Sequence, residues 1–125
     1  MIYGIGTDIC DISRIEKIYK KYGARFAAKI LTEQELQHMP KMGKYAWLAK
    51  RFAAKEAFAK AVGTGFSGGL GFHDFAVLNN KKGAPEALCS ECVQEKLPLG
   101  ARVHVSLSDE KGYALAFIVI EQIIN

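Results

Sequence analysis

The stretch that decides the fold is YAWLAKRFAAKEAFAKAV, residues 45–62. It contains neither glycine nor proline, and its commonest residue is alanine, which has the highest intrinsic helix propensity. Trp47, Phe52 and Phe58 give the stretch an apolar body. We therefore expect a long helix here, ended by Gly63, because glycine is the usual residue just past a helix C-terminus.

The first residues of the chain predict a strand that carries an acidic side chain. Residues 2–9 alternate loosely around Gly4 and Gly6 and meet an acid at Asp8. Such a pattern is typical of a strand. We expect this strand to deliver Asp8 to an edge or an end of a sheet.

Two capping-box patterns predict two further helices before the long one. Ser13 is followed three residues later by Glu16, which predicts a helix that begins at Ser13 and stops at Gly23. Thr32 with Glu35 repeats the pattern. A short helix is therefore expected there, ending before the next proline.

The second half of the chain predicts mainly strands. Residues 72–78 and 86–89 flank a turn-forming stretch, which predicts a hairpin, and residues 91–97 have room for a helical turn or two. Two longer strands are expected at residues 101–108 and 113–120, on either side of a turn.

The two longer strands differ in how their side chains are distributed. In the first, Val103, Val105 and Leu107 face one way, while Arg102, His104 and Ser106 share the other face. Residues 113–120 are apolar on both faces. Such a strand must be covered on both sides, and in a short chain the cover can come from another subunit. We therefore expect the protein to form oligomers.

The composition describes a folded protein of one domain. The chain has 125 residues, of which 50% are hydrophobic and 24% charged. This length suits a single domain, residues 1–125, with its own core. The first residues lack the basic lead-in of a signal peptide, and no apolar run reaches membrane-spanning length. These features favour a cytoplasmic protein without a membrane partner.

Charge and cysteines restrict the choice of partners. The net charge of +4 and the isoelectric point near 9.0 favour an anionic partner: a phosphorylated small molecule, an acidic protein, nucleic acid or a membrane surface. Cys89 and Cys92 have C-x-x-C spacing, but no second pair of zinc ligands accompanies them. We interpret the thiols as reduced and structural, with a redox pair as the alternative.

Charged side chains inside the long helix are the first candidates for chemistry. Glu56 and Lys60 are an i, i+4 pair on one helical face, and Arg51 and Lys55 are a second pair. The ordinary interpretation is a solvated helix with ion pairs on its surface. However, buried charges need partners or ligands, and these lie among Ala and Phe with glycines following Lys60. Glycine-rich loops let the backbone approach phosphate closely.

Asp8 could supply a second carboxylate beside Glu56. Two hard oxygen ligands are enough for Mg²⁺, which commonly completes its shell with substrate phosphates and water. A turn or helix-capping aspartate is the competing interpretation of Asp8. His104 likewise is either an ordinary strand histidine or, with Arg102 and Ser106 on its face, part of an anion-facing site.

Three blocks of the sequence resemble the acyl-carrier-protein synthases, a family of the phosphopantetheinyl transferase superfamily. They are Gly4-Ile-Gly-Thr-Asp-Ile9 followed by Arg14-Ile15, then RFAAKEAFAKAVGTG at residues 51–65, and VHVSLS at residues 103–108 leading into Tyr113-Ala114. Their order and spacing cover nearly the whole chain. One departure is Asp109, where a histidine often follows in relatives.

The resemblance implies both a fold and a reaction. The fold would be α+β, with a small antiparallel sheet packed against a long helix, in a homotrimer with active sites at the subunit interfaces. The enzyme would move 4'-phosphopantetheine from coenzyme A to a serine of apo acyl carrier protein, release adenosine 3',5'-bisphosphate and support fatty acid biosynthesis. Its cofactor would be a divalent cation, usually Mg²⁺.

The resemblance also implies roles for individual residues. Asp8 and Glu56 would bind the metal, and Lys60 would meet the pyrophosphate; Glu56 or a metal-bound water would accept the serine proton. Coenzyme A contacts would come from Arg51, Lys60, Gly63, Gly65, His104 and Ser106. The His104 face would serve the metal site of a neighbouring subunit.

The positive charge then predicts a docking surface for the acidic carrier protein. The resemblance implies Arg14 as a carrier-protein contact, and Lys17 and Lys21 share its side of the predicted helix. These residues are the predicted docking stripe. The alternative function is a non-catalytic module that binds nucleotide or RNA. It lacks the aromatic residues interleaved with basic ones that single-strand binders use, so no nucleic-acid partner is expected.

Overall fold

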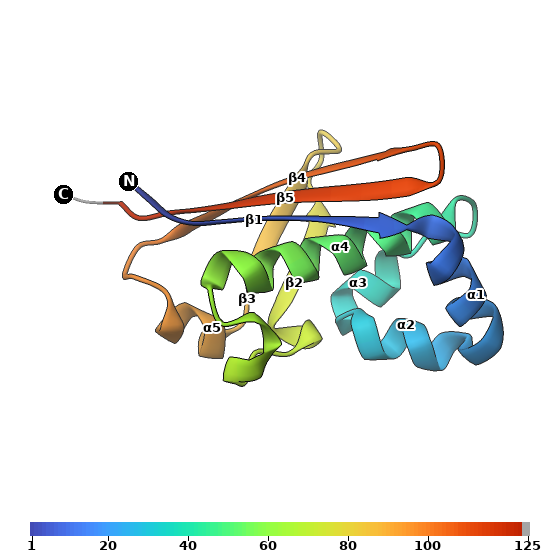
Figure 1. Cartoon of the computed structure of the whole chain (residues 1–125), viewed down its shortest axis with the longest axis horizontal. Helices are drawn as coiled ribbons and strands as arrows, with labels where there is room; N and C mark the ends of the chain where they lie inside the picture. The colour runs from blue at the N-terminus through green and yellow to red at the C-terminus, as the bar shows by residue number, and fades with distance from the viewer. Residues whose placement is uncertain (124–125) are drawn as a thin grey trace.

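The structure is a computed structural model that describes residues 1–123, without the side chains of residues 67 and 68. Strands and helices are mixed along the chain, which has the predicted α+β character (Figure 1). The elements in chain order are β1 (Ile2–Asp11), α1 (Ile12–Tyr22), α2 (Ala24–Ile30), α3 (Glu33–His38), α4 (Lys44–Val62), the 3₁₀ helices η1 (Gly65–Gly68) and η2 (Phe72–Asp74), β2 (Phe75–Asn79), β3 (Pro85–Cys89), α5 (Glu91–Lys96), β4 (Arg102–Glu110) and β5 (Tyr113–Glu121).

A three-stranded antiparallel sheet packs against α4. The strand order is β1-β5-β4, so β1 and β4 are the edges. On the face toward α4, β5 presents Ala114, Ala116, Ile118 and Ile120, all fully buried. Because the first two of these side chains are alanines, the helix backbone can approach this part of the sheet closely. Asp8 lies opposite Ala116 in the register of β1 and β5.

Helix α4 is buried on most of its surface rather than along one stripe. It contacts β1, β5 and β4 on one side and β2, α1 and η1 on others. Ala53, Ala54, Ala57 and Phe58 are all buried, which matches the alanine-rich sequence that predicted this helix. Within residues 1–123, no helix is both long enough and apolar enough to span a bilayer.

The remaining elements cover α4 from the side opposite the sheet. β2 and β3 form the predicted antiparallel hairpin, and α1, α2 and α3 gather at the end of α4 away from the chain termini (Figure 1). The capping box predicted for α3 is present: Thr32 accepts a hydrogen bond from the Glu35 backbone N–H, and Glu35 accepts one from the Thr32 backbone N–H.

The predicted helix start at Ser13 is wrong. Asp11 is the N-cap of α1, because its Oδ1 accepts hydrogen bonds from both the backbone nitrogen (2.9 Å) and the hydroxyl (2.7 Å) of Ser13. Ser13 therefore serves the cap rather than forming it, and Glu16 instead pairs with Lys20. The helix ends at Gly23 as predicted.

Two further segments differ from the sequence-based prediction. Residues 24–30 form α2, for which no helix was predicted, and the strand expected from residue 72 begins only at Phe75. Residues 72–74 form the 3₁₀ helix η2, in which Asp74 accepts a hydrogen bond from the Gly71 backbone N–H at 2.8 Å. The side chain of Asp74 therefore closes a turn that replaces the start of the strand.

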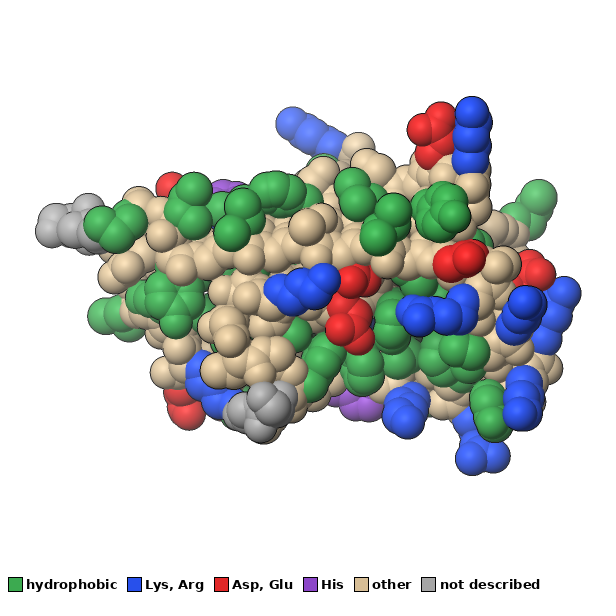
Figure 2. Space-filling model, in the orientation of Figure 1, with side chains coloured by type: hydrophobic (Ala, Val, Ile, Leu, Met, Phe, Trp, Pro, Cys, Tyr) green, Lys and Arg blue, Asp and Glu red, His purple; other side chains and the backbone are tan. Residues whose placement is uncertain are grey.

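The outer face of the sheet is apolar and exposed in the single chain. Ile5 and Ile9 of β1 are 59% and 64% exposed, and Leu115 and Phe117 of β5 are 41% and 36% exposed. Hydrophobic side chains line the upper edge of the molecule over these strands (Figure 2). The expected second apolar face of residues 113–120 is thus present, and the first face packs on α4.

Candidate active site

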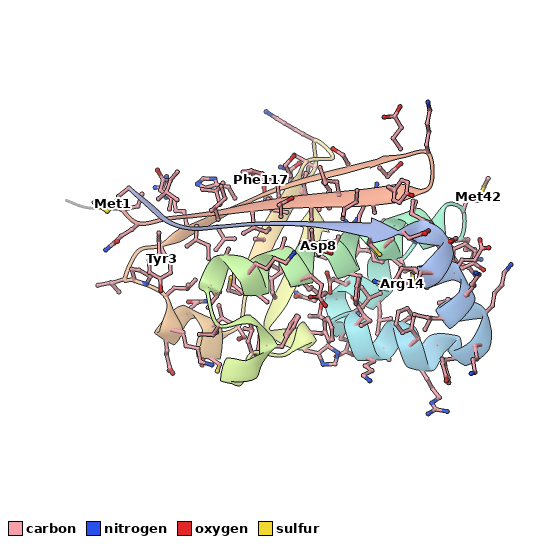
Figure 3. The ribbon with its side chains drawn as sticks, in the orientation of Figure 1. Met1, Tyr3, Asp8, Arg14, Met42 and Phe117 are labelled. Atoms are coloured by element: carbon pink, nitrogen blue, oxygen red, sulfur yellow. The ribbon has the colours of Figure 1, made fainter. Side chains whose placement is uncertain are left out.

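The site begins where β1 crosses α4 at backbone contact distance. A Cβ atom at Gly4 would lie 2.0 Å from the carbonyl oxygen of Ala61, and one at Gly6 would lie 1.9 Å from that of Ala57. No side chain fits at such distances, so both positions require glycine. Asp8 follows on the same face of β1 and is thereby set beside α4 (Figure 3).

Lys60 of α4 reaches across to β1. Its ammonium lies 3.2 Å from Oδ1 of Asp8 and donates a hydrogen bond of 2.9 Å to the carbonyl oxygen of Thr7. The Lys60 side chain is 57% exposed, whereas that of Asp8 is 19% exposed. The cation therefore stands on the solvent side of a largely covered carboxylate, where an anionic ligand can reach it.

Glu56 lies one helical turn before Lys60 and faces the same group. Partial burial raises the pKa of Glu56, and the negative charge of Asp8 raises it further, while Lys60 and Arg14 act in the opposite direction. The two carboxylates are thus close enough to repel each other. A cation between them would relieve that repulsion.

The donor set of this pair fits a hard divalent cation. Carboxylate oxygens are the ligands that Mg²⁺ prefers, and one or two of them suffice when phosphates and water supply the others. Lys60 already shows that Asp8 pairs with a cation. Among the described residues, no group of three or more His, Cys, Asp or Glu side chains is placed to bind a metal. Asp8 and Glu56 are therefore the side chains that could hold such a cation.

Arg14 extends the site onto α1. Its guanidinium lies 5.7 Å from the ring centre of Phe52 and 4.0 Å from the sulfur of Cys10, and its charge lowers the pKa of Glu56. Lys17 and Lys21 follow on the same helix, and both are exposed. Figure 2 shows acidic side chains in the middle of this face, with basic side chains on both sides and over α1 and α2.

An apolar groove borders the predicted docking stripe, and it was not predicted from the sequence. Its volume is about 500 Å³, and Phe26, Phe52 and Phe72 contribute to its wall together with residues of α1 and α2. Arg25 and Lys29 add positive charge to its lining. The groove forms because α2, the unpredicted helix, packs beside α1 and contacts η2.

Gly63 and Gly65 lie just beyond the C-terminus of α4, as the sequence predicted. The Gly63 backbone N–H donates to the carbonyl oxygens of Ala59 and Lys60, which caps the helix. The φ angles of Gly63 and Gly65 are 98° and 60°, in the left-handed region that favours glycine. The chain can therefore turn sharply directly after Lys60.

Arg51 does not lie with Asp8, Glu56 and Lys60. It is only 3% exposed, its guanidinium stacks 4.3 Å from the ring centre of Trp47, and its Nη2 donates to Oδ1 of Asn79 at 3.2 Å. Burial lowers its pKa, and its Nε has no hydrogen-bond partner among the described residues.

His104 and Ser106 lie on the outer face of β4, whereas Asp8 faces α4. His104 Nε2 is 3.0 Å from Oε1 of Glu121, and this hydrogen bond lowers the pKa of Glu121. His104 and Ser106 are both exposed. Within one chain the structure therefore does not bring them to the carboxylate pair.

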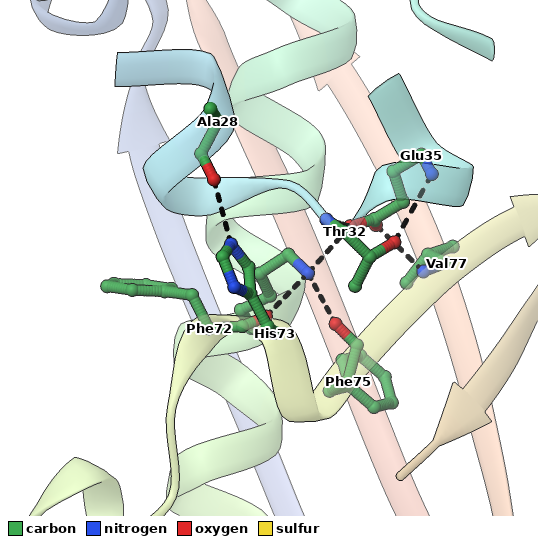
Figure 4. Close-up of polar contacts among 8 residues, drawn as sticks. Ala28, Thr32, Glu35, Phe72, His73, Phe75 and Val77 are labelled. Atoms are coloured by element: carbon green, nitrogen blue, oxygen red, sulfur yellow. Dashed lines mark hydrogen bonds and ion pairs between the residues drawn. The ribbon is translucent and has the colours of Figure 1, made fainter. Parts of the chain in front are cut away.

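Sequence reasoning missed a buried ion pair next to the site. Lys55, the residue before Glu56, is 1% exposed and lies 2.8 Å from Oε1 of Glu35, which is fully buried (Figure 4). A lysine among alanines and phenylalanines indicated a buried charge. Its partner was hidden because Glu35 belongs to another helix, where it already completed a capping box.

Asp109, the departure from the family pattern, has a structural partner. Its Oδ2 lies 2.8 Å from the ammonium of Lys50, and both side chains are partly exposed. The pair joins the end of β4 to α4. It therefore fastens the β4–β5 hairpin on the helix and takes no part in the carboxylate pair.

The chain has counterparts in a known superfamily. Residues 4–118 match the family model described as the 4'-phosphopantetheinyl transferase superfamily. This match covers almost the whole chain, so the chain belongs to that superfamily.

Within the superfamily, the chain is similar to the holo-[acyl-carrier-protein] synthases. It is 47% identical to that of Neisseria meningitidis, over 98% of this chain and 100% of the relative. A crystal structure of the enzyme from N. meningitidis superimposes with a TM-score of 0.87 at 46% identity, covering 98% and 100% of the two chains. The Helicobacter pylori enzyme in complex with coenzyme A gives 0.83 at 30% identity, covering 94% and 99%. The resemblance expected from the sequence is confirmed.

Proposed function

We propose that this chain transfers the 4'-phosphopantetheine group from coenzyme A to a serine hydroxyl of apo acyl carrier protein, with Mg²⁺, and releases adenosine 3',5'-bisphosphate. The observation that carries the proposal is the facing pair of Asp8 and Glu56 with Lys60 beside it. The names of the relatives support the donor and the acceptor. We further propose one catalytic domain, residues 1–125, acting in the cytoplasm in fatty acid biosynthesis.

The reaction is attack by a serine hydroxyl on the β-phosphorus of a pyrophosphate. Catalysis then consists mainly of positioning the groups and neutralising phosphate charge. Asp8 and Glu56 would hold Mg²⁺, which supplies charge neutralisation and orientation at the pyrophosphate when bound.

Lys60 and Glu56 have the properties that the remaining tasks need. The Lys60 ammonium is exposed beside Asp8, so it can approach the departing bisphosphate and stabilise its charge. Burial and the charge of Asp8 raise the pKa of Glu56, which makes it a stronger base than an ordinary carboxylate. We therefore favour Glu56 as the acceptor of the serine proton.

The contacts to coenzyme A fall into two groups. Gly63 and Gly65 lie three and five residues after Lys60, and their backbone could approach phosphate oxygens from this chain. Arg51 is held on Trp47 and Asn79, away from Lys60, so a contact to coenzyme A would have to occur at a distance from the pyrophosphate. His104 and Ser106 require a second copy of the chain.

A homotrimer would bring His104 and Ser106 to the carboxylate pair of a neighbour. Support comes from the exposed apolar face of β1 and β5, in which Phe117 lies beside Ser106. Oligomers mixed from Glu56→Ala and His104→Ala subunits should regain transfer activity, since some interfaces then carry both wild-type residues. Mixed oligomers without regained activity would contradict a shared site.

Carrier-protein docking is proposed on the stripe Arg14, Lys17 and Lys21 and on the groove beside it. The stripe offers exposed positive charge, and the groove offers apolar surface. Rising salt should lower the rate constant for carrier-protein association, because screening weakens steering between opposite charges. A salt-independent association rate constant would remove the stripe from the proposal.

The direct test is the mass of the carrier protein. Apo acyl carrier protein incubated with this chain, coenzyme A and Mg²⁺ should gain the mass of one phosphopantetheine group. A carrier protein whose serine is replaced by alanine is the matched control. If no adduct forms with any divalent metal, the proposed function is wrong.

A further inference from the structure

The glycine-rich segment, residues 63–71, leaves α4 next to the site and returns to the same helix. It leaves at Gly63, directly beyond Lys60. It returns at Phe72 of η2, whose ring stacks on Phe52 of α4 at a centroid distance of 5.9 Å and contacts Phe66 of η1 at a tilted angle, with centroids 4.6 Å apart. The shape of this segment therefore depends on how firmly η2 is held against α4.

Lys55 holds that return point. Its ammonium donates hydrogen bonds to the carbonyl oxygens of Phe72, at 2.9 Å, and of Phe75 (Figure 4). Its third donor goes to Oε1 of Glu35 at 2.8 Å. All the donors of the ammonium are thus used, two of them on main-chain oxygens of η2 and β2, which follow the glycine-rich segment.

Glu35 makes this buried charge tolerable. Besides Lys55, its carboxylate accepts hydrogen bonds of 2.9 Å from the backbone nitrogens of Thr32 and Val77. Burial lowers the pKa of Lys55, and the charge of Glu35 opposes that effect. Because both charged groups are fully hydrogen-bonded, the pair joins α3, α4, η2 and β2 at one point.

Lys55 cannot reach a substrate from this position. It is 1% exposed, and the next residue, Glu56, belongs to the carboxylate pair. His73, which follows Phe72 in η2, is fixed as well, since its Nε2 lies 2.8 Å from the carbonyl oxygen of Ala28. The ion pair therefore acts on the end of the glycine-rich segment and not on the reacting groups.

We propose that Lys55 is a positioning residue which, paired with Glu35, holds the glycine-rich segment in the shape that binds the phosphates of coenzyme A. The proposal rests on the proposed function, because it assigns coenzyme A to this segment. It predicts that loss of the anchor weakens coenzyme A binding. Phe72, which the anchor holds, also lines the apolar groove proposed for carrier-protein docking, so coenzyme A affinity is measured without carrier protein.

Three variants of the full chain separate this role from general stability. Lys55→Met removes the donors to Phe72 and Phe75. Glu35→Gln combined with Lys55→Met removes both charges, so that no unpaired ion stays buried and the fold recovers stability. Lys50→Met is the matched control, because it removes a lysine of the same helix whose partner is Asp109.

Two measurements decide the proposal. In Lys55→Met, hydrogen exchange of the amides in residues 63–72 should become faster by at least about tenfold, with β1 and β5 unchanged. The Kd for coenzyme A, from calorimetry with Mg²⁺, should rise by about tenfold or more, because two buried carbonyl groups lose their donors. The double variant should melt at a higher temperature than the single one and keep both defects, and Lys50→Met should show neither.

Several results would overturn the proposal. One is a double variant that recovers coenzyme A affinity together with its melting temperature, since the pair would then be merely structural. Another is unchanged exchange of residues 63–72 in the folded variants. If Lys55→Met does not fold, the double variant carries the same test. A wild-type chain that binds no coenzyme A refutes the proposed function, whereas exchange tests the anchor independently of any activity.

Discussion

Two lysines of α4 form ion pairs of similar length, but one pair is buried and the other lies at the surface. Lys55 is 1% exposed and lies 2.8 Å from Glu35, whereas the Lys60 side chain is 57% exposed and lies 3.2 Å from Asp8. The first pair is surrounded by protein and holds four elements together. The second stands at the surface, where its partners can be exchanged for a ligand. On this helix, burial therefore distinguishes the structural ion pair from the ion pair that can take part in chemistry.

The helical period explains why neighbouring charges divide in this way. Successive residues advance by about 100° around the axis, so Lys55 and Lys60 point in directions about 140° apart. Glu56 and Lys60, an i, i+4 pair, share the side that faces β1. One alanine-rich helix can thus present an anchor to α3 and β2 and a reactive pair to β1.

The largest effect is expected from variants of Asp8 and Glu56, which leave the buried pair of Lys55 and Glu35 intact. Asp8→Ala and Glu56→Ala should each lower transfer by at least about 10³-fold, because each removes a metal ligand that stabilises developing charge. The melting temperature should hardly change, since neither side chain holds the core together. Initial rates and thermal melts of both variants are the measurement. Variants that keep normal activity would place the metal elsewhere.

The next largest effect is expected from a variant that breaks the buried pair of Lys55 and Glu35 alone. Glu35→Gln leaves the Lys55 charge buried without a counter-ion, which should lower the free energy of unfolding by about 3 kcal/mol. Urea denaturation is used to compare this variant with Glu56→Gln, the same substitution in the carboxylate pair. The free energy of unfolding of Glu56→Gln should stay near that of the wild type. Equal stability of the two variants would remove the distinction between the two sides.

A third variant tests the close contact between β1 and α4, because it forces β1 to move away from the helix. The Cβ atom of Gly6→Ala would lie 1.9 Å from the carbonyl oxygen of Ala57, so the strand must shift, at about 2 kcal/mol in stability. Asp8 shifts with it, and transfer should fall even where the variant is folded. Gly71→Ala is the control for stability, because its Cβ would meet only an Asp74 oxygen at 3.6 Å. Equal stability of the two variants would contradict the close contact.

The smallest effect concerns the pair between Lys50 and Asp109. Both side chains are partly exposed, so Asp109→Asn should cost only about 0.5 kcal/mol. Transfer rates should match wild type, since the pair lies outside the carboxylate group. Denaturation at low and high salt measures the difference. A loss comparable to that of Glu35→Gln would show that burial is not what separates the pairs of α4.

Much of the fold followed from long or repeated patterns in the sequence. The uninterrupted alanine-rich stretch predicted α4, and the box of Thr32 with Glu35 predicted α3. Helix α2 escaped because it is short and has Gly23 as its N-cap, without a side-chain cap. Two good capping residues two positions apart, Asp11 and Ser13, made the start of α1 ambiguous, and the structure uses the first.

The candidate site was predictable where its residues lie close in sequence. Glu56 and Lys60 share a helical face by spacing alone. Asp8 was one plausible partner carboxylate for Glu56, with a turn or capping role as the alternative, and the resemblance to a family then implied it as a metal ligand. What could not be predicted was the contact that unites them, since it depends on how closely Gly6 approaches α4. Arg51 belonged to the same block but turned inward, and its role in binding coenzyme A stays a prediction.

The crossing of β1 over α4 also limits how this protein can change. The atoms that Gly4 and Gly6 approach are main-chain oxygens, which every residue at positions 57 and 61 would carry. A larger side chain on β1 therefore cannot be accommodated by a smaller one on the helix, and repacking offers no second-site suppressor. Selection for revertants of Gly6→Ala should return glycine itself, even though most core contacts tolerate paired substitution.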